Sequence, residues 1–283
     1  MRRPGGPDQG RGVHDVPPDP LFSSPARIVL PPVVDGPWGG VNLRSVPGDS
    51  DKAGMRDSLF RTPGTRVRVK ICCIGSIDEA RIALEAGADA LGLVSAMPSG
   101  PGPIAEEEIR RIIAWAGDRA DTVLLTSRQT APGITEQAER LGPSILQLVD
   151  ELPSDALDEL RHSNPGRAIM PVLHVPAGNA VEEARRVAPY SDALLLDSGN
   201  PAGVVKELGG TGRVHDWEVS RAIVVASSVP VFLAGGLNAG NVTAAIHAVN
   251  PYGVDVCSGV RTAGRLDREK TLTFIQAVRR VTF

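Results

Sequence analysis

The chain has 283 residues, a hydrophobic share of 42% and a formal net charge of −3 at pH 7. The length suits one large domain, and the nearly neutral charge excludes the basic surface typical of proteins that bind nucleic acid or anionic membranes. No apolar run approaches the roughly 18 residues that a membrane-spanning helix needs. We therefore expect neither nucleic acid nor membrane as a partner.

Residues 1–64 differ in composition from the rest of the chain. They are rich in proline and glycine and lack sustained hydrophobic periodicity. Such a segment buries too little apolar surface to order itself, and it contains no apolar core of a signal peptide. The prediction is a disordered N-terminal extension over residues 1–64, followed by one catalytic domain over residues 65–283. The sparse cysteines, Cys72, Cys73 and Cys257, indicate a reducing, cytoplasmic location.

From residue 67 onward, short apolar segments alternate regularly with helical patterns. Strands are predicted at 67–73, 90–94, 122–126, 145–149, 169–174, 193–197, 229–234 and 253–257. Helices are predicted after them at 77–86, 106–116, 134–141, 155–162, 181–187, 217–226, 239–248 and 268–281. Strands that are almost wholly apolar fit a parallel sheet buried on both faces. Eight such units favour an α/β fold with a single closed (β/α)8 TIM barrel, although the count alone leaves an open doubly wound sheet possible.

Glycine-rich turns follow the last three predicted strands. Residues 209–212 follow the sixth, Gly235 and Gly236 follow the seventh, and Ser258 and Gly259 follow the eighth. Such turns let backbone N–H groups approach an anion, and the next helix adds its positive N-terminal end. In barrels of this type the loops after strands 7 and 8 often bind phosphate. The pattern therefore predicts a phosphate site, and with it a phosphorylated small-molecule ligand.

Two further strand ends carry reactive side chains. Asp197 ends an apolar run, and it is either a turn or capping residue or a partly buried acid with a raised pKa. Cys72 ends the first strand, and it is either an inert buried residue or a thiolate base at the catalytic rim. Strand alternation predicts that only one of Cys72 and Cys73 faces the barrel mouth. His174 ends the fifth strand, but catalysis is assigned to no histidine.

These residues resemble the motifs of the phosphoribosylanthranilate isomerase family. The resemblance rests on segments in the family's order, which cover nearly the whole folded part of the chain. The segments are Lys70-Ile71-Cys72, Leu195-Leu196-Asp197, Gly209-Gly210-Thr211-Gly212 with Asp216-Trp217, Ala234-Gly235-Gly236-Leu237, and Val254-Asp255-Val256 with Ser258-Gly259-Val260.

The resemblance implies an Amadori rearrangement in tryptophan biosynthesis, without metal or organic cofactor. Asp197 would be the general acid that opens the sugar ring, and Cys72 the general base that removes the proton from C2. The phosphate would be held by Gly210, Gly235, Gly236, Ser258 and Gly259. The substrate pocket would include Asp255, Gln147 and Arg261. Members of the family are monomers or homodimers, and either state is compatible with this sequence.

Several positions depart from the family's pattern. The family usually has glycine where this chain has Cys73, glutamate where it has Arg261, and serine where it has Cys257. Its fourth strand typically ends Gln-Leu-His-Gly, whereas this one reads Gln147-Leu148-Val149-Asp150. The second loop, 99–104, lacks the arginine that clamps the anthranilate carboxylate, an interaction that glycine cannot imitate.

The missing arginine leaves three hypotheses open. The chain catalyses the family's reaction, with Arg261 or Arg128 replacing the clamp; or it isomerises another phosphorylated sugar or ribosylamine; or it is a non-catalytic sugar-phosphate binder.

Overall fold

A computed structural model describes residues 59–60, 66–98, 100–175, 179–198 and 216–282. Eight parallel strands form a closed barrel in the order β1 to β8, with β1 paired to β8. The predicted (β/α)8 barrel is therefore confirmed, and the open sheet is excluded. The strands are β1 (Arg68–Ile71), β2 (Ala90–Val94), β3 (Asp121–Thr126), β4 (Ile145–Leu148), β5 (Ala168–His174), β6 (Leu194–Asp197), β7 (Val231–Leu233) and β8 (Gly253–Val256).

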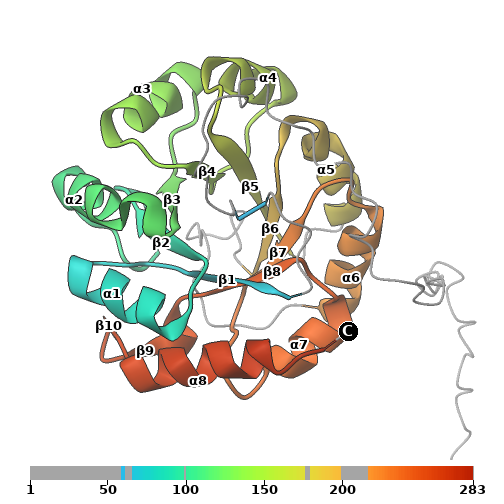
Figure 1. The fold of residues 1–283 in the computed structure, drawn as a ribbon. Helices are drawn as coiled ribbons and strands as arrows, with labels where there is room; N and C mark the ends of the chain where they lie inside the picture. The colour runs from blue at the N-terminus through green and yellow to red at the C-terminus, as the bar shows by residue number, and fades with distance from the viewer. Residues whose placement is uncertain (1–58, 61–65, 99, 176–178, 199–215, 283) are drawn as a thin grey trace, which may run out of the picture. The chain divides into compact units, whose positions relative to one another are not determined.

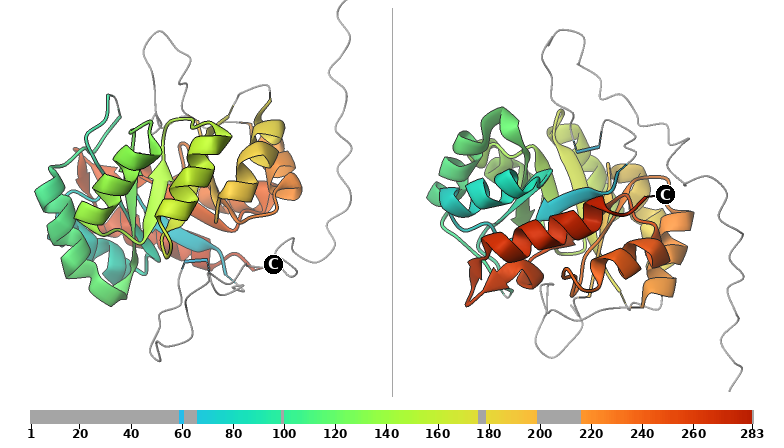
Figure 2. Two further views of the ribbon diagram at one scale, coloured as in Figure 1. Left: turned by 90° about the horizontal axis from the view of Figure 1, so that it is seen from above. Right: turned by 60° about the horizontal axis from the view of Figure 1, so that its bottom comes forward.

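One helix follows each strand and lies outside the barrel (Figure 1). The helices are α1 (Ile77–Ala86), α2 (Glu106–Ala116), α3 (Ala131–Leu141), α4 (Ser154–Ser163), α5 (Ala180–Val187), α6 (Trp217–Ala226), α7 (Val242–Val249) and α8 (Arg268–Arg279). Helix α8 packs against both α1 and α7 (Figure 2). The last helix thus meets the first, which closes the outer ring of helices. None of the helices in the described part of the chain is long and apolar enough to cross a membrane.

Local sequence explains where α1 begins and ends. The Ser76 side chain accepts a hydrogen bond from the Glu79 backbone N–H at 3.2 Å, which satisfies one of the free donors of the first turn. Gly87 ends the helix with φ of 100°, a left-handed conformation that glycine adopts without steric cost. These two residues fix α1 directly after the first strand, and so they set the length of the loop that carries Cys72 and Cys73.

The barrel has two apolar cores, as strands buried on both faces require. One lies between the strands and the helices, and it includes Val69, Ile71 and Phe274. The other fills the barrel interior, and it includes Met170 and Phe232. Side chains of both sets are fully or almost fully buried.

Two residues before the first strand also belong to the interior core. Leu59 is buried, and its N–H donates to the Asp121 carboxylate at 2.6 Å. The Phe60 and Phe232 rings pack edge to face, with their centroids 6.0 Å apart. The Tyr252 hydroxyl donates a hydrogen bond to the Leu59 carbonyl. The packed unit thus reaches residue 59, before the expected boundary at 65. The rest of the predicted disordered extension lies outside the described residues.

Candidate active site

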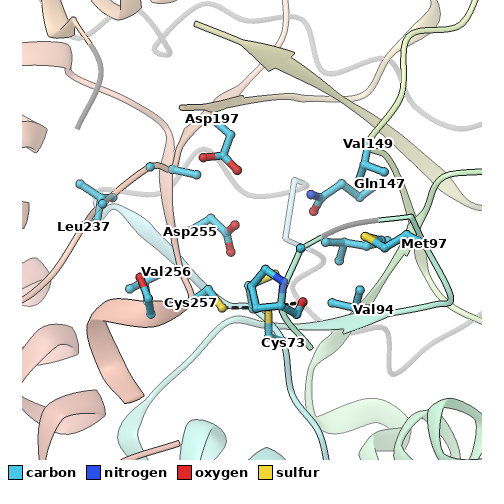
Figure 3. Close-up of a pocket in the computed structure, with 18 residues that line it drawn as sticks. Cys73, Val94, Met97, Gln147, Val149, Asp197, Leu237, Asp255, Val256 and Cys257 are labelled. Atoms are coloured by element: carbon cyan, nitrogen blue, oxygen red, sulfur yellow. Dashed lines mark hydrogen bonds between the residues drawn. The ribbon is translucent and has the colours of Figure 1, made fainter. Parts of the chain in front are cut away.

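A pocket lies at the carboxyl ends of the barrel strands, and its side chains come from almost every part of the ring (Figure 3). This is the end of the barrel at which functional residues are expected. Its lining residues are Cys72, Cys73, Val94, Met97, Gly100, Pro101, Leu125, Gln147, Val149, Asp197, Ala234, Gly235, Gly236, Leu237, Asp255, Val256, Cys257 and Ser258.

The pocket has an apolar side. Val94 ends β2, Met97 and Pro101 follow in the second loop, Leu125 belongs to β3, and Val149 follows β4. Figure 3 shows Val94, Met97 and Val149 on the side of the pocket opposite Leu237. An apolar wall of this kind suits a flat hydrophobic group such as an aromatic ring.

Asp197 supplies a carboxyl group to the opposite, polar side. It is the last residue of β6, it is partly exposed, and its side chain points into the pocket (Figure 3). One carboxylate oxygen accepts a hydrogen bond from the Ser198 backbone N–H at 2.6 Å. The other has no hydrogen bond to the described residues, so it is available to a ligand.

Cys72 lies directly after β1, where its N–H donates to the Val256 carbonyl and extends the strand pairing by one residue. The side chain is 5% exposed and lines the pocket. Lys70, two residues earlier, projects to the same interior face of the barrel. Cys72 therefore stands in the pocket with a buried cation beside it.

Lys70 itself was assigned no role from the sequence. It is fully buried, and its ammonium group contacts the Asp255 carboxylate at 2.8 Å. Burial opposes its charge, but Asp255 and Cys72 outweigh that effect and raise the pKa of Lys70 above its ordinary value. A lysine within a predicted barrel strand is the signal that could have identified it, since lysine is almost never buried unless paired.

Asp255 lies opposite Lys70 in the pairing of β1 with β8, which explains the short contact. Burial raises the pKa of its carboxyl group, Lys70 opposes that shift, and the nearby Asp197 adds to it. Figure 3 shows Asp197 and Asp255 facing the same space. Asp197 and Asp255 thus both line the pocket, and the buried Lys70 ammonium group contacts Asp255 from outside the lining.

Cys73 differs from the sequence prediction. The prediction that only one of the adjacent cysteines faces the barrel mouth is wrong, because both line the pocket. The strand ends at Ile71, and Cys73 has a φ of 62°, so the alternation of a strand no longer applies. Its sulfur lies 3.5 Å from the Pro101 carbonyl oxygen and 2.8 Å from the Cys257 sulfur.

The turns after β7 and β8 have the geometry expected of a phosphate site. Gly235 and Gly236 have φ of 85° and 63° and line the pocket. Their N–H groups have no acceptor among the described residues, so they can donate to an anion. Ser258 adds an exposed hydroxyl group to the same side.

Gly259 brings these two turns together, although it does not itself line the pocket. A Cβ at this position would lie 2.0 Å from the Leu237 carbonyl oxygen, so only glycine lets the two loops approach so closely. Gly210, the remaining predicted phosphate ligand, lies outside the described residues.

Gln147 lies in the pocket, as expected, and offers it an unused polar group. The side chain is 3% exposed, and its amide oxygen has no hydrogen-bond partner. Figure 3 shows the amide pointing toward Asp197 and Asp255. A buried polar atom without a partner is costly, so a ligand that bonds it would be stabilised.

Arg261 does not lie in the pocket lining. Its guanidinium group binds both carboxylate oxygens of Glu79 at 3.1 Å and also donates to the carbonyl groups of Cys72 and Cys73. Arg128 and His174 are likewise absent from the lining. Among the described residues, neither arginine proposed as a replacement clamp reaches the pocket.

Comparison with known proteins places this geometry in a family. The family described as N-(5'-phosphoribosyl)anthranilate (PRA) isomerase matches residues 69–277. The chain belongs to this isomerase family. The PRA isomerase of Haloferax volcanii is 38% identical over 216 residues, which cover 75% of this chain and 93% of that protein.

Solved structures of PRA isomerases have the same fold. The structure from Pyrococcus furiosus is similar with a TM-score of 0.62 and 31% identity, covering 76% of this chain and 100% of that one. Another was solved in complex with reduced 1-(o-carboxyphenylamino)-1-deoxyribulose 5-phosphate, with a TM-score of 0.64 and 26% identity over 76% of this chain and 100% of that one.

Cys73 has a backbone conformation that is uncommon for a residue other than glycine. The φ of 62° at this residue is the conformation that glycine adopts most readily. Gly102, with φ of 84°, packs closely over Cys73, since a Cβ there would lie 2.7 Å from the Cys73 Cβ. The second loop therefore covers Cys73 with Gly102 and Pro101.

Proposed function

We propose that this chain isomerises N-(5'-phosphoribosyl)anthranilate to the corresponding aminodeoxyribulose phosphate, the Amadori rearrangement of tryptophan biosynthesis. The observation that carries the proposal is that Cys72 and Asp197 line one pocket together with the glycine turns after β7 and β8. An acid, a base and a phosphate site on separate sides of one pocket suit acid–base chemistry on a phosphorylated sugar.

Asp197 is proposed as the general acid. It donates a proton to the ring oxygen of the sugar, the C1–O bond breaks, and the amine lone pair forms a C1=N double bond. A carboxyl group at the polar rim suits this step because one oxygen is held by Ser198 while the other is available to the substrate.

Cys72 is proposed as the general base. Its thiolate removes the proton from C2, and the C–H electron pair forms a C1=C2 double bond while the imine nitrogen recovers its lone pair. The enol then loses its hydroxyl proton and gains one at C1, which gives the ketone. The Lys70 ammonium group is buried on the same face of the barrel, where it contacts Asp255.

Substrate binding follows the two sides of the pocket. We propose that the N–H groups of Gly235 and Gly236, with Ser258, Gly259 and Gly210, bind the phosphate. The aromatic ring would lie against Met97, Val149 and their apolar neighbours, and the Gln147 amide oxygen, which has no partner among the described residues, is available to the substrate. Asp255 would shape the floor, where Lys70 holds it.

The two alternative hypotheses are not favoured. The relatives that cover three quarters of the chain are named for the same isomerisation. A binder without catalysis would need neither Cys72 nor Asp197 in the pocket.

The three cysteines are free, which fits a reducing, cytoplasmic location. We propose a catalytic domain over residues 65–283, which packs against residues 59–60. That the protein is a monomer or a homodimer remains a prediction.

The proposal is tested by following the fluorescence of N-(5'-phosphoribosyl)anthranilate with purified full-length protein. The wild type is expected to consume the substrate, and Asp197→Asn to lower kcat by about 10²- to 10⁴-fold, because an amide is far too weak an acid to transfer a proton to the ring oxygen. Asp155→Asn, an exposed position at the start of α4, is the matched control and should keep the wild-type rate. An inactive wild type, or an Asp197→Asn variant with full activity, would contradict the proposal.

A further inference from the structure

Cys73 and Cys257 form a pair of thiols in the wall of the pocket. Their sulfur atoms lie 2.8 Å apart, as the dashed line in Figure 3 marks. Cys73 comes from the loop after β1 and Cys257 from the loop after β8, two strands that pair side by side in the barrel. The residues are 184 positions apart in sequence, so their proximity depends on closure of the barrel.

The two thiols are not equivalent. Cys257 is partly exposed at the pocket, whereas Cys73 is 6% exposed beneath the second loop. A hydrogen bond from the Cys73 thiol, together with the charge of Arg261, lowers the pKa of Cys257 despite its burial. The same hydrogen bond and burial raise the pKa of Cys73. Cys257 is thus the thiol that ionises first and the one that a solute reaches.

Cys72 cannot easily replace Cys257 as the disulfide partner of Cys73. Cys72 and Cys73 are consecutive, and consecutive Cα atoms are about 3.8 Å apart across a trans peptide bond. A disulfide usually joins Cα atoms about 4.4–6.8 Å apart, so a bond between these neighbours would be strained. The geometry therefore pairs Cys73 with Cys257 and leaves Cys72 as a free thiol.

We propose that Cys73 and Cys257 form a redox-active dithiol that closes to a disulfide on reaction with a small disulfide such as oxidised glutathione. The Cys257 thiolate attacks one sulfur of the oxidant, a mixed disulfide forms, and one glutathione thiolate leaves. The Cys73 thiol then loses its proton and attacks the Cys257 sulfur, which releases the second glutathione. The protein loses two electrons and two protons, and the oxidant gains both.

Closing the bond draws the two sulfurs from 2.8 Å to about 2.05 Å. Cys73 directly follows Cys72, and the Arg261 guanidinium group contacts the carbonyl groups of both residues. The movement would therefore displace the residue proposed as the base. We expect oxidation to lower turnover reversibly, by ~10-fold or more, since a misplaced catalytic group loses rate steeply. The expected loss of turnover rests on the proposed isomerase function, whereas disulfide formation does not.

The chemistry is tested with full-length protein incubated with oxidised glutathione and then mapped by peptide mass spectrometry. We expect the free thiols to fall from three to one, with Cys73 joined to Cys257 and Cys72 unmodified. Cys257→Ser should form no internal disulfide, whereas Cys72→Ser should form it as the wild type does. Three free thiols after the incubation, or a disulfide that includes Cys72, would overturn the proposal.

Turnover is measured on the same samples before oxidation, after oxidation, and after reduction with dithiothreitol. Lower turnover that returns on reduction supports the regulatory effect, and a disulfide that leaves turnover unchanged overturns it. If the reduced protein has no isomerase activity, the proposed function fails, while the thiol mapping still decides whether the dithiol exists.

Discussion

Gly259 is the residue at which the two proposed phosphate turns meet. A Cβ at this position would lie 2.0 Å from the Leu237 carbonyl oxygen, so Gly259→Ala must push the loops apart. We expect the free energy of unfolding to fall by about 1–3 kcal/mol. We also expect weaker binding of inorganic phosphate, because Gly235 and Gly236 belong to the displaced loop. Urea denaturation and calorimetric titration measure the two effects.

Gly75→Ala is the matched control for this substitution. Gly75 also lies in a loop after a barrel strand, but a Cβ there meets the nearest atom, an oxygen of Glu79, at an ordinary 3.6 Å. Its stability and phosphate affinity should stay near those of the wild type. Equal behaviour of the two variants would show that the close approach of the loops does not hold the phosphate site together.

Cys72 and Asp197 were singled out because each ends a predicted strand, and the structure places both in the lining of one pocket. Their catalytic roles stay predictions. Cys73 was misjudged, because a φ of 62° in a non-glycine residue leaves no trace in the sequence pattern. Arg261 was expected to contact the substrate, but Glu79 binds it, and no local pattern links residues 182 positions apart.

At the scale of elements, β2, α1, α2 and α6 have the predicted bounds, because apolar periodicity and capping residues mark them clearly. Helix α7 begins at Val242, three residues later than predicted. Asn241 explains the delay, since its side chain binds the Asn238 N–H and the Gly236 carbonyl and holds the preceding turn out of the helix.

The short hairpin of β9 (Arg261–Thr262) and β10 (Arg265–Leu266) was not predicted at all. Strands of two residues carry no measurable periodicity, so the sequence could not reveal them. The hairpin has a role in the site, because Glu79 accepts hydrogen bonds from both Leu266 and Arg261. It thereby ties the loop after β8 to α1 and to the loop that bears Cys72.

The pairing of Lys70 with Asp255 also belongs to this scale. Each residue is a charged side chain within a short strand, and their contact follows from the register of β1 against β8. That register depends on closure of the barrel, so it could be expected from the fold but not from either strand alone.

At the scale of the whole barrel, Asp89 joins its first and last elements. Its carboxylate accepts a hydrogen bond from the Val69 N–H in β1 and one from Arg279 at the end of α8, and it also contacts Arg66. Burial opposes the charge, but these hydrogen bonds outweigh burial and hold the pKa of Asp89 below its ordinary value. A carboxyl group of lowered pKa stabilises the fold above its unfolded pKa, near 3.9, and loses that effect as the pH falls through the folded pKa.

Asp89→Asn should therefore lower the free energy of unfolding by about 2–3 kcal/mol at pH 7. The difference from the wild type should shrink below about pH 4, where the wild-type carboxylate also becomes protonated. Urea unfolding at a series of pH values measures this trend. Asp78→Asn is the control, because Asp78 is 82% exposed and pairs only with the exposed Arg81 among the described residues. A difference that persists unchanged in acid would contradict the assignment.

The most direct measurement compares the turnover of N-(5'-phosphoribosyl)anthranilate by the wild type, Cys72→Ser and Cys73→Gly. Both cysteines line the pocket, but only Cys72 is proposed to take the C2 proton. The predicted result is an active wild type, a loss of about 100-fold or more in kcat for Cys72→Ser, and activity within about tenfold of the wild type for Cys73→Gly. An inactive wild type, or a larger loss for Cys73→Gly than for Cys72→Ser, would contradict the proposed mechanism.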